Sequence, residues 1–397
     1  MQKAFGHVTA ASGFRAAGIC CGIKANVRDL ALLVSETRAA AAGTFTTNSF
    51  CAAPVILSRA RLRSGGARAI IVNSGCANAA TGDAGMRDAE LITRDVARML
   101  SIDRAEVLAA STGRIGRRLP VKKILSGLST LVGRLSVEGG RDAARAILTT
   151  DTCPKEALTR RVIGRREITV GGMAKGAGMI HPMMATMLAF ITTDAAITPG
   201  CLKELLRESV EKSFNRISVD GDRSTNDSVF VLASGLAGNP VIERGDSKAG
   251  RLFSSALDEI TATLAEKIVR DGEGASKLIE IVVSGARDRR EATRLGFAIA
   301  NSPLFKTAMY GEEPNWGRIL SALGGAGVAL RPERVRVVLQ GECVFRRGAP
   351  AGADERALRT RMGMAHIKVE IVLDRGRAEE RILTCDLTPD YVELNKR

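Results

Sequence analysis

Apolar, β-branched runs alternate with amphipathic stretches along the chain, a pattern that predicts mixed α and β structure. Residues 69–72 (AIIV), 278–283 (LIEIVV) and 335–339 (VRVVL) are short apolar runs typical of buried strands. The sequence shows no internal repeat and no low-complexity linker. We therefore expect a mixed α/β fold without a repeat architecture.

Two segments have the pattern of β-hairpins. Residues 161–170 (RVIGRREITV) place a glycine and charged residues between two β-branched runs. The runs 369–373 and 382–387 flank the polar segment DRGRAEER in the same way. The sequence therefore predicts two hairpins, one in the middle of the chain and one near its end.

Two helices are marked by apolar residues that recur at helical spacing. One stripe covers residues 202–214 after Pro199, and the other covers residues 257–268. The second helix leads into the segment DGEGASK, whose glycines are expected to end it. Both apolar stripes are interpreted as faces that pack into the core.

The segment 171–195 (GGMAKGAGMIHPMMATMLAFITTDA) combines a glycine-rich start with a strand-like end over residues 187–193. Thr186 stands where the two meet. Glycine tolerates backbone conformations that other residues avoid, so an unusual backbone is expected before the strand. No GK[ST] follows these glycines, which argues against a phosphate-binding loop.

Length and composition are those of an ordinary globular protein. The 397 residues are enough for two domains or one large one, with 45% hydrophobic and 25% charged residues. No run approaches the roughly 20 apolar residues that a membrane span needs. The first residues, MQKAFGHVTAASGFRAAG, contain no apolar core of a secretory signal. We therefore expect a cytoplasmic protein without a membrane segment.

The net charge of +15 would suit either a nucleic-acid-binding surface or the attraction of anionic small molecules. The basic residues occur in small scattered groups, and aromatic residues make up only 4%. Few aromatic side chains are therefore available for the bases of single-stranded nucleic acid to stack on. An ordinary solvated surface is favoured, attraction of carboxylate substrates is the second interpretation, and no nucleic-acid partner is expected.

The sequence offers few residues for metal binding or for catalysis by histidine. Only three histidines occur, and they form no H-x-x-x-H pair: they are His7, His181 and His366. None of the eight cysteines forms a C-x-x-C pair. We predict no metal site, and the general base of any acyl chemistry is expected to be a group other than histidine.

The segment 175–188 (KGAGMIHPMMATML) closely resembles the self-processing motif of the ArgJ family, the ornithine acetyltransferases (glutamate N-acetyltransferases) of arginine biosynthesis. Eight further blocks follow the order of that family: GIKANVRDLALLVSE, AAGTFTTNSFCAAPV, VNSGCANAATG, STGRIGRRLP, TTDTCPK, SFNRISVDGDRSTND, RDGEGASK and SPLFKTAMYGEEPNWGRI. By itself a threonine that begins a strand is structural. The resemblance instead implies that the chain cuts itself between Ala185 and Thr186.

The resemblance also implies the roles of particular residues. Thr186 would be the nucleophile, and its new α-amine, with an ordinary pKa of about 7.7–8.0, suits a general base near neutral pH. The Thr112 hydroxyl and the Gly113 amide would form the oxyanion hole. The substrate-binding positions that carry over are Thr152, Lys175, Thr186, Glu273 and Asn395. A Ser or Thr that follows the asparagine in the family is replaced here by Lys396 and Arg397, so we expect that contact to be missing.

The implied fold is an α/β sandwich of stacked sheets flanked by helices, as in DmpA- and ArgJ-like proteins, with a smaller C-terminal α/β domain. Residues 1–185 would form an α chain and residues 186–397 a β chain, assembled as an α2β2 heterotetramer. Acetylornithine and glutamate are the implied substrates. No cofactor is expected, and acetyl-coenzyme A is a possible acetyl donor.

Two alternatives have the same fold and nucleophile. One is an amidase or aminopeptidase, in which water takes the acyl group. The other is a paralogous acyltransferase that acts on another acyl amino acid. Lys175 and Glu273 together favour an amino-acid acceptor, because they offer opposite charges to its carboxylate and its amine.

Overall fold

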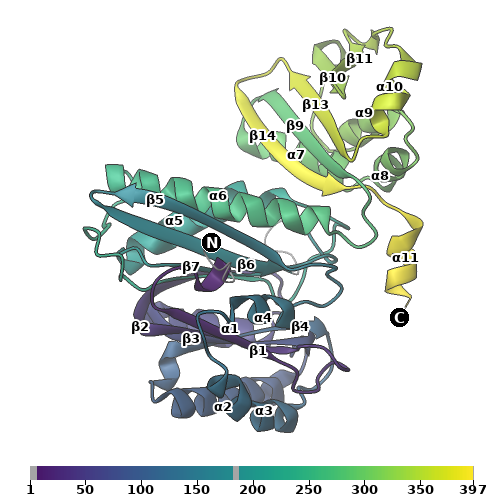
Figure 1. Cartoon of the computed structure of the whole chain (residues 1–397). Coiled ribbons are helices and arrows are strands. Elements are labelled where there is room, and N and C mark those ends of the chain that lie inside the picture. Colours follow the sequence, from purple (N-terminus) through teal and green to yellow (C-terminus); the bar gives the residue numbers. More distant parts are fainter. Residues whose placement is uncertain (1–6, 182–186, 397) are drawn as a thin grey trace. The chain divides into compact units, whose positions relative to one another are not determined.

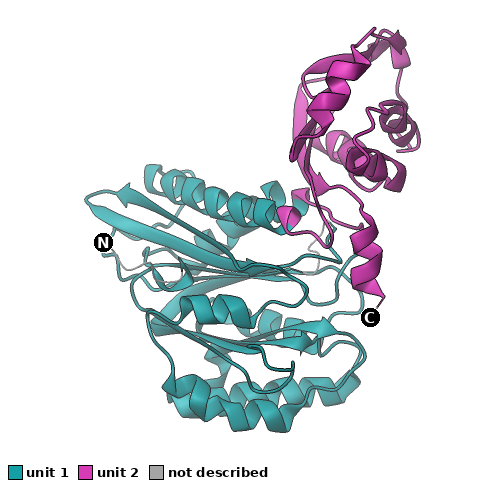
Figure 2. Ribbon diagram, turned by 45° about the vertical axis from the view of Figure 1, so that its right-hand side comes forward, with its two compact units in different colours: residues 1–215, 222–268 teal, residues 216–221, 269–397 magenta. Residues whose placement is uncertain are grey.

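The computed structural model describes residues 7–181 and 187–396, which form two compact units (Figure 2). Unit 1 comprises residues 1–215 and 222–268, and unit 2 comprises residues 216–221 and 269–397. This division differs from the predicted α and β chains, whose boundary at residue 185 falls within unit 1. Each unit has its own sheet and its own core.

An eight-stranded sheet forms the centre of unit 1, in the order β4-β3-β2-β8-β7-β6-β5, with β1 paired to β2. Its strands are β1 (Phe14–Ile19), β2 (Leu30–Phe45), β3 (Gly66–Cys76), β4 (Val107–Arg114), β5 (Lys155–Ile163), β6 (Arg166–Lys175), β7 (Leu188–Thr193) and β8 (Ser228–Ala233). Every residue of β7 and β8 is buried, as expected for continuous apolar runs in the middle of a sheet.

The long strand β2 joins two halves of this sheet. Its first part pairs with β1 and β3, its last part pairs with β8, and its register shifts between Val34 and Ala39. Figure 1 shows the half that contains β1–β4 stacked on the half that contains β5–β7. A shared apolar core lies between the halves, with Phe14 and Ile70 from one and Phe190 and Phe230 from the other.

Helices cover the outer faces of both halves (Figure 1). On one side, apolar residues of α2 and α3 pack on β2 and β3. On the other, Ile260 and Leu264 of α6 reach Gly172 of β6, where there is no room for a larger residue without a shift. The helices are α1 (Ala53–Arg61), α2 (Gly82–Leu100), α3 (Val121–Gly133), α4 (Gly140–Ala146), α5 (Pro199–Lys212) and α6 (Lys248–Arg270). The predicted sandwich of stacked sheets flanked by helices is confirmed.

Unit 2 is a smaller α/β structure around a six-stranded sheet, in the order β12-β11-β10-β13-β9-β14. Its strands are β9 (Leu278–Ala286), β10 (Val335–Leu339), β11 (Glu342–Arg346), β12 (Ala349–Pro350), β13 (His366–Leu373) and β14 (Ala378–Cys385). Its helices are α7 (Arg289–Ala300), α8 (Pro303–Tyr310), α9 (Gly317–Gly324), α10 (Glu355–Met362) and α11 (Pro389–Asn395). One apolar cluster fills its core.

Most predicted elements are confirmed, and one hairpin is wrong. β5 and β6 form the predicted antiparallel hairpin, with Ile163 opposite Arg166. β13 and β14, however, do not pair with each other, because β9 lies between them. The short connection passes the end of β9, where the amides of Arg375 and Gly376 bond to the carbonyl of Gly285. Among the described helices, none is long and apolar enough to cross a membrane.

Candidate active site

The predicted oxyanion residues lie at the end of β4, a strand that runs parallel to β3. Thr112 is 1% exposed, and its buried hydroxyl has no hydrogen-bond partner among the described residues. A buried hydroxyl without a partner costs about 1–3 kcal/mol, so such groups are rare and need a reason. A ligand oxygen that accepts a hydrogen bond from the Thr112 hydroxyl would be such a reason.

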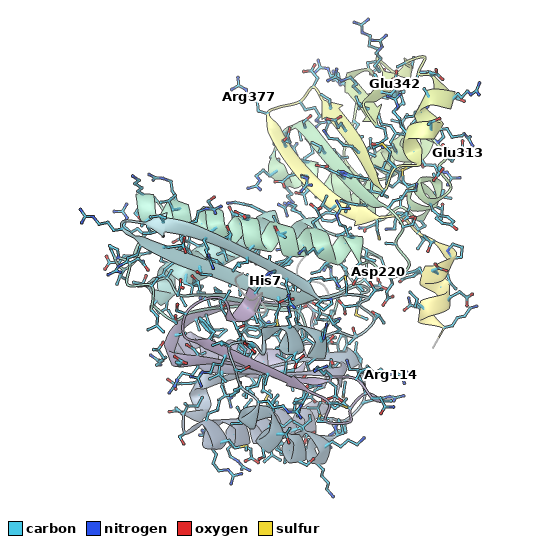
Figure 3. All side chains as sticks on the ribbon, in the orientation of Figure 1. His7, Arg114, Asp220, Glu313, Glu342 and Arg377 are labelled. Carbon is cyan, nitrogen blue, oxygen red and sulfur yellow. The ribbon has the colours of Figure 1, made fainter. Side chains whose placement is uncertain are left out.

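Gly113 occupies a position that only glycine can fill. Its φ is +129°, and a Cβ there would lie 2.3 Å from the Gly75 carbonyl carbon and 2.5 Å from the Cys76 nitrogen. The next residue, Arg114, is exposed and marks this end of β4 in Figure 3. The close approach of β3 therefore requires glycine directly after Thr112.

Lys175, at the end of β6, is buried in a cluster of charged groups. Its ammonium donates to the Thr149 hydroxyl at 2.7 Å and lies 3.4 Å from the Asp151 carboxylate. Asp151 also accepts from Lys155 at 2.7 Å and from the Gly176 amide at 2.6 Å. Burial opposes ionisation of Asp151, but the two ammonium groups outweigh it and hold its pKa well below the usual range. One carboxylate thus faces two buried cations, which leaves an excess of positive charge.

A cavity of about 520 Å³ opens beside this cluster. Its polar lining includes Lys24, Arg28, Arg134, Arg145, Thr149 and Asp151. The ammonium of Lys24 donates to the Leu148 carbonyl at 2.7 Å, and its pKa is lowered by burial and by the charge of Lys175. The arrangement suits a carboxylate ligand. Thr152, the remaining candidate of this region, is exposed on the loop before β5.

Ala185 and Thr186 lie outside the described residues. The chain on either side is described: β6 and β7 pair antiparallel, with Lys175 opposite Leu188. His181 is half-buried, and burial together with the charge of Arg223 lowers its pKa to about 4. A histidine with that pKa is a weak base at neutral pH, which agrees with a base other than histidine.

Glu273 and Asn395 come together in unit 2. The Asn395 side-chain amide donates to the Glu273 carboxylate at 2.7 Å and to the Tyr391 carbonyl at 2.9 Å. Gly274 has a φ of +69°, and a Cβ there would lie 2.6 Å from the Tyr391 nitrogen. Close packing of helix α11 on this glycine therefore brings together two candidates 122 residues apart.

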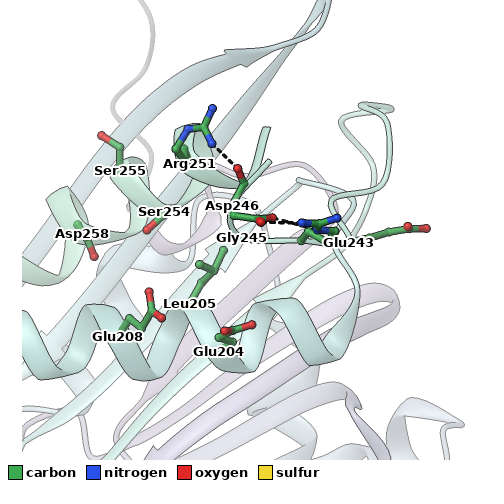
Figure 4. Close-up of a pocket in the computed structure, with 11 residues that line it drawn as sticks. Glu204, Leu205, Glu208, Glu243, Gly245, Asp246, Arg251, Ser254, Ser255 and Asp258 are labelled. Atoms are coloured by element: carbon green, nitrogen blue, oxygen red, sulfur yellow. Dashed lines mark hydrogen bonds and ion pairs between the residues drawn. The ribbon is translucent and has the colours of Figure 1, made fainter. Parts of the chain in front are cut away.

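A metal site and a second cavity are the two other possibilities. Within residues 7–181 and 187–396, no group of three or more His, Cys, Asp or Glu side chains could hold a metal ion. A cavity of about 750 Å³ in unit 1 is lined by five acidic and two basic side chains from α5, α6 and the loop before α6, among them Glu204, Glu208 and Asp258 (Figure 4). It contains none of the predicted site residues, and its charge is the wrong one for a carboxylate.

Sequence reasoning missed several groups in blocks that it had already singled out. Thr149 and Asp151 belong to TTDTCPK, and Asn226 and Asp227 end the block that finishes in RSTND. A run of polar residues directly before a strand as apolar as β8 is the signal that could have drawn attention to the second pair.

Comparison with known proteins identifies the family of this chain. The model of the ArgJ family matches residues 15–397. The arginine biosynthesis bifunctional protein ArgJ of Symbiobacterium thermophilum is 48% identical over 398 residues, covering 100% of this chain and 99% of that protein. Its counterpart in Dehalococcoides mccartyi is 46% identical over 393 residues, covering 98% and 96%.

A solved structure has the same affiliation. The crystal structure of arginine biosynthesis bifunctional protein argJ from Bacillus halodurans superposes with a TM-score of 0.50 at 39% identity, covering 52% of this chain and 97% of that chain. Because the family model and both relatives extend over nearly the whole sequence, this chain belongs to the ArgJ family.

Proposed function

We propose that the protein is a self-cleaving acetyltransferase that moves an acetyl group from N2-acetyl-L-ornithine to L-glutamate. The observation that carries the proposal is the buried Thr112 hydroxyl, which has no partner among the described residues and stands beside the obligatory Gly113. Both lie in a chain whose relatives are named for arginine biosynthesis.

The first half-reaction begins at Thr186, after cleavage of the Ala185–Thr186 bond. The Thr186 hydroxyl attacks the acetyl carbonyl, and its proton passes to the α-amine of the same residue. Thr112 and Gly113 donate to the oxyanion of the tetrahedral intermediate. As the intermediate collapses, the bond from carbon to the ornithine nitrogen breaks, that nitrogen takes the proton, and an acetyl ester remains on Thr186.

Glutamate reverses these steps in the second half-reaction. Its amine attacks the ester carbon and passes a proton to the Thr186 α-amine. The bond from that carbon to the threonine oxygen then breaks, the oxygen takes the proton, and N-acetylglutamate is released. Lys175 and the basic cavity beside it bind the carboxylate of each amino acid, while Thr152, Glu273 and Asn395 contact its polar groups. No cofactor takes part, and acetyl-coenzyme A is included as a second acetyl donor.

We further propose that the protein is cleaved and oligomeric in the cell. Residues 1–185 and 186–397 are the α and β chains of an α2β2 heterotetramer in the cytoplasm. Denaturing electrophoresis with intact mass should give two fragments that separate between Ala185 and Thr186. Thr186→Ala should remain one chain of 42.1 kDa.

Incubation with acetylornithine, with and without glutamate, tests the reaction. We expect ornithine release to depend on glutamate, with N-acetylglutamate formed in equal amount. Release that ignores glutamate would identify an amidase. Activity only with another acyl amino acid would identify a paralogous acyltransferase. Replacing acetylornithine by acetyl-coenzyme A tests the second donor.

A further inference from the structure

The loop before β8 is polar yet buried. Ser224, Thr225, Asn226 and Asp227 are between 0% and 7% exposed. Buried polar side chains must find hydrogen-bond partners to offset the loss of water. The partners of the last two residues lie on two strands that the mechanism uses.

Asn226 holds the strand of the oxyanion hole. Its side-chain amide donates to the Ser111 carbonyl at 2.8 Å and to the Ala77 carbonyl at 2.6 Å, which uses both of its N–H donors. Ser111 directly precedes Thr112. The amide therefore fixes the backbone of β4 at the residue before the proposed oxyanion donors.

Asp227 holds the strand of the nucleophile. One carboxyl oxygen accepts from the Met187 amide at 3.0 Å. The main chain strengthens the link, because the Ser228 amide bonds to the Met187 carbonyl at 3.3 Å. In sequence, the Met187 nitrogen is the atom to which the carbonyl carbon of Thr186 is bonded. Asp227 therefore fixes the amide nitrogen of the first described residue after the nucleophile.

The chemical state of Asp227 is unusual as well. The residue is 0% exposed, and Oδ2 has no hydrogen-bond partner among the described residues. Burial raises its pKa well above the usual range and outweighs the opposing effects of the Met187 amide, the Ser224 side chain and the Lys175 charge. Asparagine keeps the shape of the carboxyl group and an oxygen that can accept from the Met187 amide.

We propose that Asn226 and Asp227 are positioning residues that tie the oxyanion strand and the nucleophile strand to one loop. The inference rests on the proposed function and adds two residues to it. Neither residue reacts; each sets the backbone from which a reacting group is presented. Because the chemistry depends on placement to a fraction of an ångström, loosening either tie should slow catalysis without weakening substrate binding.

Asp227→Ala removes the Met187 tie, and Asp227→Asn keeps an oxygen that can accept from it. We expect Asp227→Ala to slow self-cleavage and to lower kcat by about 10- to 100-fold, the range for a buried amide left unpaired, with KM for acetylornithine unchanged. Asp227→Asn should restore both to near the wild-type values. If Asp227→Asn were as impaired as Asp227→Ala, the carboxyl would have an acid–base role and the positioning proposal would be overturned.

Asp194 supplies the matched control at the other end of β7. It is 4% exposed and accepts from the Thr169 amide at 2.7 Å and the Ser12 amide at 3.2 Å. Asp194→Ala should lower the melting temperature but leave the kcat of the folded enzyme unchanged. An equal fall in kcat for Asp194→Ala and Asp227→Ala would reduce the effect to general destabilisation and contradict the proposal.

Asn226 is tested through Thr112. We expect Asn226→Ala to lower kcat in the wild-type enzyme and to have a smaller further effect in Thr112→Val, because only the Gly113 amide then remains to be positioned. Additive effects would overturn the proposed coupling. This cycle also decides the matter if Asp227→Ala does not fold. A wild-type enzyme that neither cuts itself nor transfers acetyl would remove the proposed function and this inference together, whereas active wild type with unimpaired variants removes the inference alone.

Discussion

The buried Thr112 hydroxyl has no partner among the described residues, and this costs stability that an isosteric change would relieve. In Thr112→Val we expect the melting temperature to be unchanged or higher. The turnover of acetylornithine should fall by about 100- to 1000-fold, the loss typical of one oxyanion donor. Initial rates of ornithine release and thermal unfolding measure the two effects.

Thr44→Val is the matched control, because the buried Thr44 hydroxyl also lacks a partner among the described residues and belongs to β2. It should keep full activity. If Thr112→Val were as active as Thr44→Val, the hydroxyl would have no part in the oxyanion hole.

Asp151 is expected to contribute stability that depends on pH. Its folded-state pKa lies below the ordinary value of about 3.9, so its contribution is present above that pH and is lost as pH falls through the folded-state pKa. Asp151→Asn removes the negative charge that offsets the two buried ammonium groups of Lys155 and Lys175 and should cost about 3–5 kcal/mol at pH 7. Urea unfolding at pH 7 and at pH 3.5 should show the difference shrinking on acidification.

The exposed pair of Arg244 and Asp246 gives the comparison for that measurement. Asp246→Asn should change stability far less at pH 7, because water screens surface charges. A pH-independent loss in Asp151→Asn would mean that shape, and not charge, is what Asp151 provides.

Asp227 should have the opposite dependence. Its raised pKa means that the folded chain binds a proton that the unfolded chain releases above about pH 3.9, so stability falls as pH rises toward the folded-state value, by up to about 1.4 kcal/mol per pH unit. Asp227→Asn removes this dependence. Relative to wild type it should gain stability in urea unfolding as pH rises above about 3.9, and a difference that does not change with pH would show that the folded-state pKa of Asp227 is not raised.

At the scale of elements, the end of β4 depends on one glycine. In Gly113→Ala the new methyl group meets the backbone of Gly75 and Cys76, which cannot move aside as a side chain would. We expect a loss of about 1–3 kcal/mol in the free energy of unfolding, together with loss of acetyl transfer because the strand end shifts.

Gly116, on the loop that follows β4, is the control that distinguishes steric clash from backbone strain. Its φ is +77°, but a Cβ there meets no heavy atom within 4 Å. Gly116→Ala should therefore cost less stability than Gly113→Ala and preserve activity. Equal losses would place the cause in the dihedral angle alone.

The sequence was informative about elements where the pattern is local. Apolar runs located β3, β9 and β10, and the turn at Gly164 located the β5–β6 hairpin, because each signal lies within a few residues. Pairing between distant segments was not accessible in this way. Nothing in the two strand-like runs near the C-terminus records that β9 inserts between them.

The same limit applies to the candidate site. Motif resemblance named Thr112, Gly113 and Lys175, whose surroundings in the structure are unusual in burial or backbone geometry. It assigned no role to Asp151 or Asp227. Their importance comes from burial and from partners 24 and 40 residues away, and both depend on the folded sheet.

At the scale of the molecule, the two proposed chains are interleaved in one sheet. β7 and β8 belong to residues 186–397, yet β8 pairs with β2 and β7 pairs with β6, both from residues 1–185. Cutting the Ala185–Thr186 bond removes no strand pairing. We expect the two fragments to migrate separately under denaturing conditions and to remain one particle in native mass spectrometry.

Residues 1–185 produced alone provide the control. That fragment lacks the two central strands, so β2 and β6 would each expose an unpaired edge, and we expect it to aggregate. Fragments that separated under native conditions, or a soluble folded 1–185 piece, would contradict the interleaved sheet.

Because the strands are interleaved, the proposed cut also records whether a molecule has folded. Strands on both sides of the bond must find their places before the geometry that breaks it can exist, so a molecule that misfolds keeps its full length. The ratio of cleaved to uncleaved chain then reports the fraction of molecules that folded, and it can be measured long after folding. In a library of core variants, a single denaturing gel would rank foldability without purification, ligand or activity assay.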